Sequence, residues 1–397
     1  MARVQYQNLI KVFEAKGRES GRSLVRQAFR EKHADPRNVD FGALFAECFG
    51  WNDFHHCRST GASAVEVMES AGAVATMSFQ EISREAIQSM IMDPYQSPEF
   101  VLSNLIPVRQ SAFSFEKVLG VSQIGDEVSE VAEGEEYPLA GVTQSYMHMP
   151  ETKKRGFRVQ LTREAIFFDR TNLIQARCGN GGLSMGQNRE KRATDCVIDE
   201  NGGAKSAVEG GHRYHFKGNS IATYGNSSGN HDWDNLQASN QLLDQSDVDA
   251  AIQLFNGLTD PDTGEPIVLA ARHLLVAQSQ EMTARAIRDM TKRTYTLPGF
   301  ATSGNPVQIE VAGNGLPNFE IITGPYVAAR LATDTDWFYG DISQAFEYVQ
   351  NWAPEVKRLG ANTQLEFSND IVDQYRFSEY GNFGTKNPRY MTKSTVA

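Results

Sequence analysis

Several features that mark secreted, membrane or disulfide-bonded proteins are scarce in this sequence. Only four of its 397 residues are cysteine, which favours free thiols in a reducing compartment over a disulfide framework. No apolar run approaches the roughly 20 residues that span a bilayer, and the N-terminal segment lacks the apolar stretch of a secretory signal. These absences predict a soluble protein that is assembled in the cytoplasm.

Basic residues are also in the minority. Lys and Arg number 38 against 49 Asp and Glu, which gives a formal net charge of −11. Because phosphate binding needs a basic surface, this balance argues against a dedicated nucleic-acid-binding protein, though not against one that merely encloses nucleic acid. Residues 1–32 are an exception, with eight bases and three acids.

The most informative feature is a pair of neighbouring segments with opposite charge. Residues 125–137 carry six acids and no base, whereas residues 152–163 carry five bases and no acid. The acids are Asp126, Glu127, Glu130, Glu133, Glu135 and Glu136, and the bases are Lys153, Lys154, Arg155, Arg158 and Arg163. Two polar arms of a hairpin make a poor domain core but a suitable extension over a neighbouring molecule, which indicates assembly rather than catalysis. The alternative is a solvated hairpin within one subunit, with acids facing bases across a ladder.

The chain is long enough for two or more domain cores, at roughly 150 residues each. Hydrophobic spacing predicts short helices over residues 1–70, one of them at 41–49, and an extended or partly helical segment over 71–112. Within the latter, a helix over 79–92 should end before Asp93-Pro94, because proline breaks the helical hydrogen-bond pattern. Its apolar face would contain Ile82, Ala86 and Ile87.

A glycine-rich stretch interrupts the helical pattern in the middle of the chain. One helix is predicted over 162–177, with Thr162 as its N-cap, and a second over 183–199. The glycines between them are Gly179, Gly181 and Gly182. They predict a flexible joint rather than a phosphate-binding loop, because neither the G-x-G-x-x-G spacing nor a following Lys-Ser/Thr pair is present.

Strand patterns lie on both sides of this region. Residues 157–161 alternate between apolar and polar side chains, as a strand does. Residues 200–240 are rich in Gly, Asn and Ser, which is typical of a long loop, here with short strands at 213–217 and 221–224.

Residues 245–351 form the most compact α/β stretch. Helices are predicted at 248–255, 280–290 and 343–352, and strands at 267–270, 274–277, 307–311, 319–322 and 336–339. Ser246 and Asp249 resemble a capping box for the first of these helices. The final stretch, 356–395, predicts further strands.

No motif makes a strong case for catalysis or for a metal. Residues 225–229 match G-x-S-x-G, which would make Ser227 a nucleophile, but no helix follows as that motif requires. His55, His56 and Cys57, with Cys48 nearby, lack the paired spacing of zinc ligands. Residues 260–265 resemble the start of a calcium loop without its later acceptors. The loop histidines, His212, His215 and His231, share no ligand spacing.

Several segments resemble the major capsid proteins of tailed bacteriophages. Residues 154–171 (KRGFRVQLTREAIFFDRT) resemble the segment that joins the extended loop to the long helix in that family. Shorter matches lie at 124–127, 133–135, 260–266, 337–341 and 367–376, together with Gly381. The resemblance covers about residues 75–397 and implies an α+β fold of the Hong Kong ninety-seven type.

The resemblance implies five parts. Residues 1–74 would be a helical N-terminal region, either scaffold-like or on the inner surface, followed by an N-terminal arm over 75–112 and an extended β-hairpin loop over 113–160. The peripheral domain, with a long spine helix, would take in 161–235 and 355–397, and the axial α/β domain 236–354.

The implied function is that of a major capsid protein that self-assembles through hexamers and pentamers into an icosahedral shell. The shell would enclose double-stranded phage DNA without sequence-specific binding. An encapsulin-type nanocompartment shell is the alternative, and a serine hydrolase is a remote one. No enzyme activity, cofactor, metal or membrane is expected. Portal, scaffold or decoration proteins are candidate partners, and the virion is the expected location.

The assembly contacts would come from the charged segments of the extended loop. The residues are Asp126, Glu127, Glu130, Glu133, Glu135, Glu136, Lys153, Lys154, Arg155 and Arg158. Some family members crosslink a loop lysine to an asparagine of a neighbour, but residues 119–152 contain no lysine. We therefore expect the loop to hold neighbours by strand and charge contacts rather than by a covalent bond.

Overall fold

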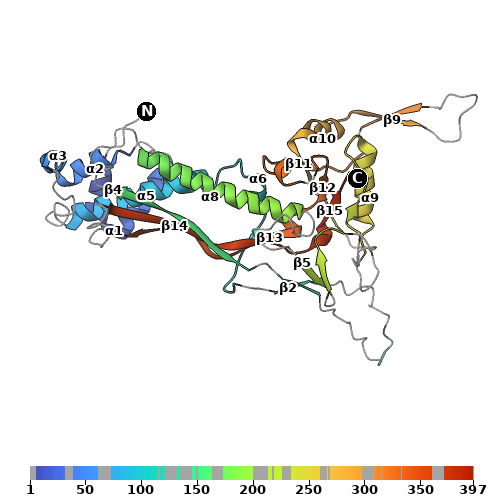
Figure 1. Ribbon diagram of the computed structural model, residues 1–397, viewed down its shortest axis with the longest axis horizontal. Helices are drawn as coiled ribbons and strands as arrows, with labels where there is room; N and C mark the ends of the chain where they lie inside the picture. Colours follow the sequence, from blue (N-terminus) through green and yellow to red (C-terminus); the bar gives the residue numbers. More distant parts are fainter. Residues whose placement is uncertain are drawn as a thin grey trace, which may run out of the picture. The chain divides into compact units, whose positions relative to one another are not determined.

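The computed structural model contains two compact units (Figure 1), and each draws on distant parts of the chain. The first comprises Met1–Glu99, Lys154–Asn188 and Trp352–Tyr380, and the second comprises Phe100–Lys153, Arg189–Asn351 and Gly381–Ala397. The residues that the structure describes are 6–31, 39–60, 73–114, 117–120, 131, 133–134, 145–148, 151–162, 173–199, 213–216, 219–225, 234–259, 266, 269–296, 308–313, 315–331, 333–359 and 371–396.

Helices make up the N-terminal part of the first unit. They are α1 (Tyr6–Arg30), α2 (Phe41–Phe49), α3 (Trp51–Thr60) and α5 (Ala73–Tyr95). Helix α2 has the predicted bounds because Asp40 caps it: its carboxylate accepts hydrogen bonds from the amides of Gly42 (2.9 Å) and Ala43 (3.1 Å). Helix α1 is longer than the short helices that we predicted.

Helix α5 also exceeds its prediction, since it begins at Ala73 and continues through Pro94. A proline this close to the end of a helix removes only one backbone hydrogen bond, so the last turn tolerates it. Ile82, Ala86 and Ile87 are fully buried, as predicted. The segment expected to be extended or only partly helical is therefore mostly one long helix with an apolar face.

One hydrophobic core holds the first unit together. It joins Val25 and Phe29 of α1 to Phe45 of α2 and to the apolar face of α5. The same cluster includes Cys178 and Met185 of the long helix α8 (Leu173–Ile198), together with Val159, Tyr375 and Phe377 from two strands.

The predicted break in α8 is wrong, because the helix runs without interruption through Gly179, Gly181 and Gly182. A Cβ on Gly181 would stand 2.5 Å from the Phe157 ring, and one on Gly182 would stand 2.2 Å from the Ile91 carbonyl oxygen. These two glycines therefore allow close packing instead of acting as a joint. Thr162 is the last residue of a strand, not a helix N-cap.

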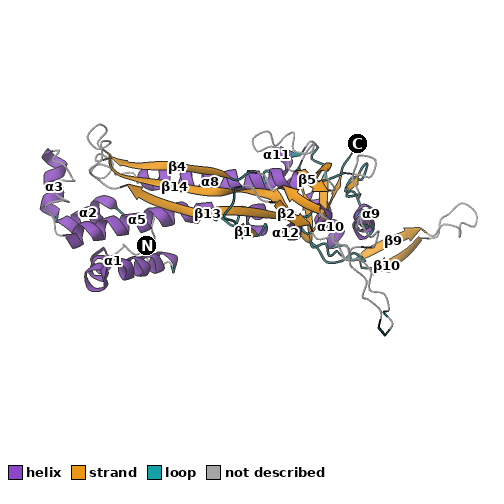
Figure 2. Cartoon of the chain, turned by 90° about the horizontal axis from the view of Figure 1, so that it is seen from below, coloured by secondary structure: helices purple, strands orange, loops and turns teal. Residues whose placement is uncertain are grey.

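Long strands form a four-stranded sheet in the order β1-β13-β14-β4 (Figure 2). Their bounds are β1 (Val108–Gln110), β4 (Lys153–Thr162), β13 (Phe346–Leu359) and β14 (Ile371–Thr385). The helix predicted over 343–352 is wrong, since only the short α12 (Ile342–Ala345) precedes β13. Residues 346–350 are buried on both faces of the strand although Glu347 and Gln350 are polar, so their sequence does not show the alternation that distinguishes a strand from a helix.

A five-stranded sheet lies at the centre of the second unit, in the order β11-β8-β12-β15-β7. The strands are β7 (Leu236–Gln237), β8 (His273–Val276), β11 (Glu320–Thr323), β12 (Trp337–Gly340) and β15 (Met391–Ser394). Leu275 and Phe338 belong to one core cluster and Trp337 and Tyr339 to another, so both faces of the sheet are covered. The strands predicted at 274–277, 319–322 and 336–339 are confirmed within one residue.

Helices α9 (Gln245–Asn256) and α10 (Glu281–Arg288) confirm two further predictions. The capping box of α9, however, uses Asp244 and Asp247 instead of Ser246 and Asp249. The short elements of this unit are α6 (Val101–Leu105), η4 (Gln278–Gln280), α11 (Val327–Arg330) and η5 (Pro388–Tyr390). Of the strand predicted at 267–270, residues 267 and 268 lie outside the described residues, and the other two are not in a strand.

Two smaller antiparallel assemblies complete the second unit. Strands β9 (Lys292–Thr296) and β10 (Gln308–Ala312) form a two-stranded ribbon. Strands β2 (Lys117–Gly120), β3 (Ser145–His148), β5 (Arg213–Phe216) and β6 (Asn219–Ala222) form a sheet in that order, which confirms the short strands predicted within residues 200–240. No helix in the described part of the chain has the length and apolar character needed to cross a bilayer.

Candidate assembly surface

The basic segment lies on β4, an edge strand of the four-stranded sheet. Phe157 and Val159 turn inward, where Phe157 packs on Phe377 with ring centroids 5.6 Å apart. Lys154 and Arg158 alternate with them and are exposed. The period of two that defines a strand thus places Phe157 and Val159 in the core and Lys154 and Arg158 on the surface.

The remaining bases do not share this face, because Lys153 and Arg155 have the same register as Phe157 and Val159. Lys153 is exposed and Arg155 is half-buried, whereas Arg163 lies outside the described residues. On the inner side, β4 approaches β14 so closely that a Cβ on Gly156 would stand 2.2 Å from the Phe377 carbonyl oxygen. This glycine lets the edge strand pack tightly against β14.

The acidic segment lies in the stretch of chain that connects β2 and β3. These two strands form a hairpin whose last pair is Gly120 and Ser145. Glu133 is exposed, next to Gly134 with a φ of +92°. Asp126, Glu127, Glu130, Glu135 and Glu136 lie outside the described residues.

The structure describes the pairing of only one of the two charged segments. The basic strand β4 pairs with β14, whereas β2 and β3 pair with each other in a different sheet. That the acidic segment is the opposite arm of a hairpin stays a prediction, because most of its residues lie outside the described part of the chain. Sequence patterning predicts a strand over 157–161, which lies within β4, but carries no information on the ladder partner, because that partner comes from more than 200 residues later in the chain.

Hydrogen bonds close the base of the loop between residues 114 and 151. The backbone amide of Thr152 donates to the carbonyl oxygen of Ser114 at 3.0 Å. Asn382 Nδ2 donates to the Glu151 carbonyl oxygen at 3.1 Å, and Asn351 Nδ2 donates to the carbonyl oxygens of Ser111 (3.1 Å) and Phe113 (2.7 Å). Residues 111–114 and 151–152 are thus fixed to each other and to Asn351 and Asn382 of the second unit.

Large apolar side chains are exposed on each unit, which the sequence patterning did not predict. On the second unit Phe113 is 68% exposed, beside the base of the loop, and Met282 is 77% exposed on α10. On the first unit Trp352 is 59% exposed and stacks on Tyr380, with ring centroids 5.2 Å apart.

The other candidate residues do not form a site in the described structure. Ser227, His212 and His231, and the turn at 260–265, lie outside the described residues, whereas His55 lies on α3 and His215 on β5. No group of three or more His, Cys, Asp or Glu residues in the described part of the chain could hold a metal ion. Burial raises the pKa of the Cys178 thiol to about 12. Burial, and to a lesser extent the charge of Glu47, raises the pKa of the Cys48 thiol to about 12 as well. Neither thiol is therefore a reactive nucleophile.

Comparison with known proteins identifies the family. A family model described as phage capsid protein matches residues 149–394, which is more than half of the 397 residues. The chain belongs to the phage capsid protein family. The match includes β4, α8 and β13 to β15, and it confirms the resemblance that residues 154–171 indicated. The capsid protein is thus a structural component of the virion with an α+β fold.

Solved structures share low sequence identity with this capsid protein. A phage-related protein from Bordetella bronchiseptica RB50 is 13% identical with a TM-score of 0.43, covering 78% of this chain and 95% of that one. The capsid of a native GTA particle is 11% identical with a TM-score of 0.42, covering 75% and 90%. The SrpI encapsulin from Synechococcus elongatus PCC 7942 is 10% identical with a TM-score of 0.40, covering 75% and 87%. No curated protein matches the sequence.

Proposed function

We propose that this capsid protein is the major head protein of a tailed phage. Copies of the chain self-assemble through hexamers and pentamers into an icosahedral shell around double-stranded DNA. Assembly takes place in the host cytoplasm, and the protein has no catalytic activity of its own. The family match to residues 149–394 supports this function and favours a phage shell over an encapsulin-type compartment.

The mode of assembly is inferred from the basic side chains of β4, of which Lys153, Lys154 and Arg158 are exposed. An edge strand offers unpaired backbone groups as well as side chains, and native proteins either protect such an edge with charge or use it for pairing. We propose that the positive charge of β4 protects the edge and also recruits a partner. It repels the basic edge of another copy and attracts that copy's acidic segment. The charge comes from Lys153, Lys154, Arg155 and Arg158.

The acidic segment is long enough to reach another subunit. It belongs to residues 121–144, which follow β2 and precede β3. A chain that runs out and back over 24 residues can extend to about 40 Å, at roughly 3.3 Å per residue. The chain on either side of it is joined by the paired residues Gly120 and Ser145 and by the hydrogen bond between Thr152 and Ser114, so the loop can be presented to a neighbour from a fixed base.

Repeated weak pairs suit a shell better than a few strong ones. A single exposed ion pair contributes about 0–1 kcal/mol, but complementary charge fixes partner choice and orientation. Contacts of this strength also allow a misplaced subunit to dissociate. Because residues 119–152 contain no lysine, we propose that neighbours are held without a covalent bond at this loop.

Charge reversal tests this proposal. We expect the variant Lys153→Glu, Lys154→Glu, Arg155→Glu to fold as a subunit but to form no shells by electron microscopy. A matched reversal of the exposed Lys292, Arg376 and Lys386 changes net charge equally and should leave assembly intact. Reversing Glu133, Glu135 and Glu136 to Lys in the first variant should restore shells. Normal shell yield from the first variant alone would refute the charge contact.

A further inference from the structure

The N-terminal helices share their core with the rest of the first unit. Val25 and Phe29 of α1 and Phe45 of α2 are at most 5% exposed. They pack in the same cluster as Phe79, Ile82 and Ile87 of α5. Phe45 and Phe79 are in edge-to-face contact, with ring centroids 5.6 Å apart. Removal of α1 to α3 would expose the apolar face of α5 to water.

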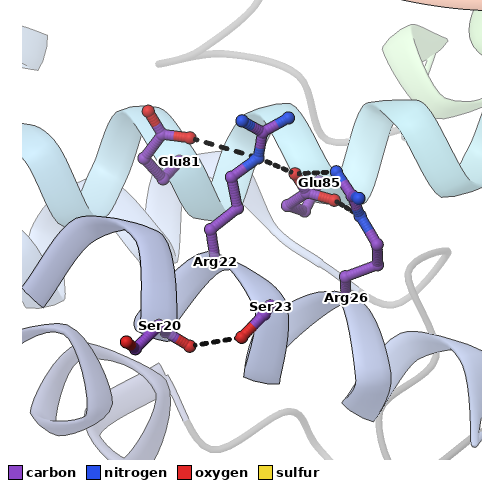
Figure 3. Close-up of polar contacts among 6 residues, drawn as sticks. All are labelled: Ser20, Arg22, Ser23, Arg26, Glu81 and Glu85. Atoms are coloured by element: carbon purple, nitrogen blue, oxygen red, sulfur yellow. Dashed lines mark hydrogen bonds and ion pairs between the residues drawn. The ribbon is translucent and has the colours of Figure 1, made fainter. Parts of the chain in front are cut away.

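A buried carboxylate adds a polar lock between α1 and α5 (Figure 3). The Glu85 side chain is 2% exposed and accepts hydrogen bonds from Arg22 Nε at 2.6 Å, Arg26 Nε at 2.9 Å and a terminal nitrogen of Arg26 at 3.0 Å. Glu81, one turn earlier on α5, lies 3.9 Å from Arg22 Nε with its side chain 5% exposed. Two acids that face inward on α5 are thus matched to two bases on α1.

This polar lock stabilises the packing of α1 on α5, because without α1 the buried Glu85 carboxylate would have no basic partner. Burial by itself would raise the pKa of Glu85, but the hydrogen bonds from Arg26 and Arg22 outweigh it and lower the pKa. The carboxylate is therefore ionised at neutral pH. Removing the partners of a buried charge is strongly unfavourable, since the charge is then left without compensation in an apolar environment.

We infer that residues 6–60 are a permanent part of the subunit core and are not a scaffolding segment that leaves during maturation. The core cluster extends from α1 and α2 through α5 to Cys178 and Met185 of α8 and to Tyr375 and Phe377 of β14. Even if the chain were cut between Gly61 and Gly72, the helices α1 to α3 would stay bound. The inference concerns the subunit itself and does not depend on shell formation.

A cleavage experiment tests the inference on the full chain. A recognition sequence for a site-specific protease is inserted between Gly61 and Gly72, and the folded, unassembled subunit is cut and passed through a gel-filtration column at neutral pH. We expect the N-terminal fragment to elute with the remainder of the chain and to separate only in denaturant. Separation in native buffer, with the remainder still folded by circular dichroism, would overturn the inference.

Matched variants distinguish the effect of the Glu85 contacts from a general loss of stability. In the cut protein, Glu85→Ala should increase the rate of fragment release by about tenfold or more. Asp93→Ala removes an exposed acid from the same helix and should change that rate by less than about twofold. Equal release rates for the two variants would show that Glu85 is no lock.

Purified DNA-filled particles give an independent readout. We expect mass spectrometry of their subunits to detect peptides from residues 6–60 at the same abundance as peptides from α8. Particles whose subunits lack these peptides would contradict the inference whatever the behaviour of the isolated subunit.

Discussion

Gly182 of α8 lies directly against the backbone of Ile91 on α5, so that a Cβ at residue 182 would stand 2.2 Å from the Ile91 carbonyl oxygen. The atom in the way is backbone, which cannot rotate aside as a flexible side chain can. The two helices can approach this closely only because residue 182 has no side chain.

Substitution of this glycine should therefore be costly. We expect Gly182→Ala to lower the free energy of unfolding by about 1–3 kcal/mol, the usual range for overpacking. At Gly179, one turn earlier in the same helix, a Cβ would meet no atom within 4 Å, so Gly179→Ala should raise stability by up to about 1 kcal/mol through helix propensity. Urea denaturation of the unassembled subunit measures both, and equal effects of the two variants would contradict the packing argument.

Glu190 of α8 predicts a second stability effect, in the second unit. Its carboxylate is buried and accepts hydrogen bonds from the amides of Leu102 (2.9 Å) and Ser103 (2.8 Å) at the start of α6. Glu190→Ala leaves both amides without an acceptor and should lower the free energy of unfolding by about 2–4 kcal/mol. Glu190→Gln keeps one acceptor oxygen and should lose less. A Glu190→Ala subunit as stable as wild type would show that water or a shift of α6 replaces the carboxylate.

The environment of His273 predicts that the free energy of unfolding depends on pH. Its Nδ1 accepts a hydrogen bond from the Ile342 amide at 3.2 Å and lies 3.7 Å from Asp341 Oδ1. Burial lowers the pKa of His273, with a contribution from Arg272, against the opposing effects of Asp341 and Glu320. The native state therefore binds fewer protons at His273 than the unfolded state does. The contribution of His273 to the free energy of unfolding is fully present above the unfolded pKa of about 6.5. It is lost as the pH falls through the lower pKa of the folded state.

The expected result is a urea midpoint that falls from pH 7 to pH 5 more steeply in wild type than in His273→Gln. The control is His55→Gln, at an exposed position on α3, which should follow the wild-type curve. Parallel curves for wild type and His273→Gln would mean that another group causes the acid sensitivity.

Local signals in the sequence predicted a large part of this fold. The cap Asp40 and the apolar run after it fix α2, and the spacing of Ile82, Ala86 and Ile87 identifies the buried face of α5. The central strands β8 and β12 are short, apolar and bounded by polar residues, so their positions were also predictable. In each case the residues that determine the structure lie within a few positions of one another.

The errors arise where a distant segment decides the structure. Gly181 and Gly182 look like helix breakers until Phe157 and Ile91 are packed against them. The start of β13 has the same continuous burial as a core helix, and only its partners β1 and β14 make it a strand. For the assembly surface, the sequence identified the bases of β4, but not that β14 is the ladder partner.

The position of residues 121–144 in the assembled shell tests the central claim most directly. A cryo-electron microscopy map of purified particles measures it. The account predicts that the acids between Asp126 and Glu136 lie against Lys153, Lys154, Arg155 and Arg158 of an adjacent subunit. A map in which these acids contact only the β4 of their own subunit, or point into solvent, would contradict it.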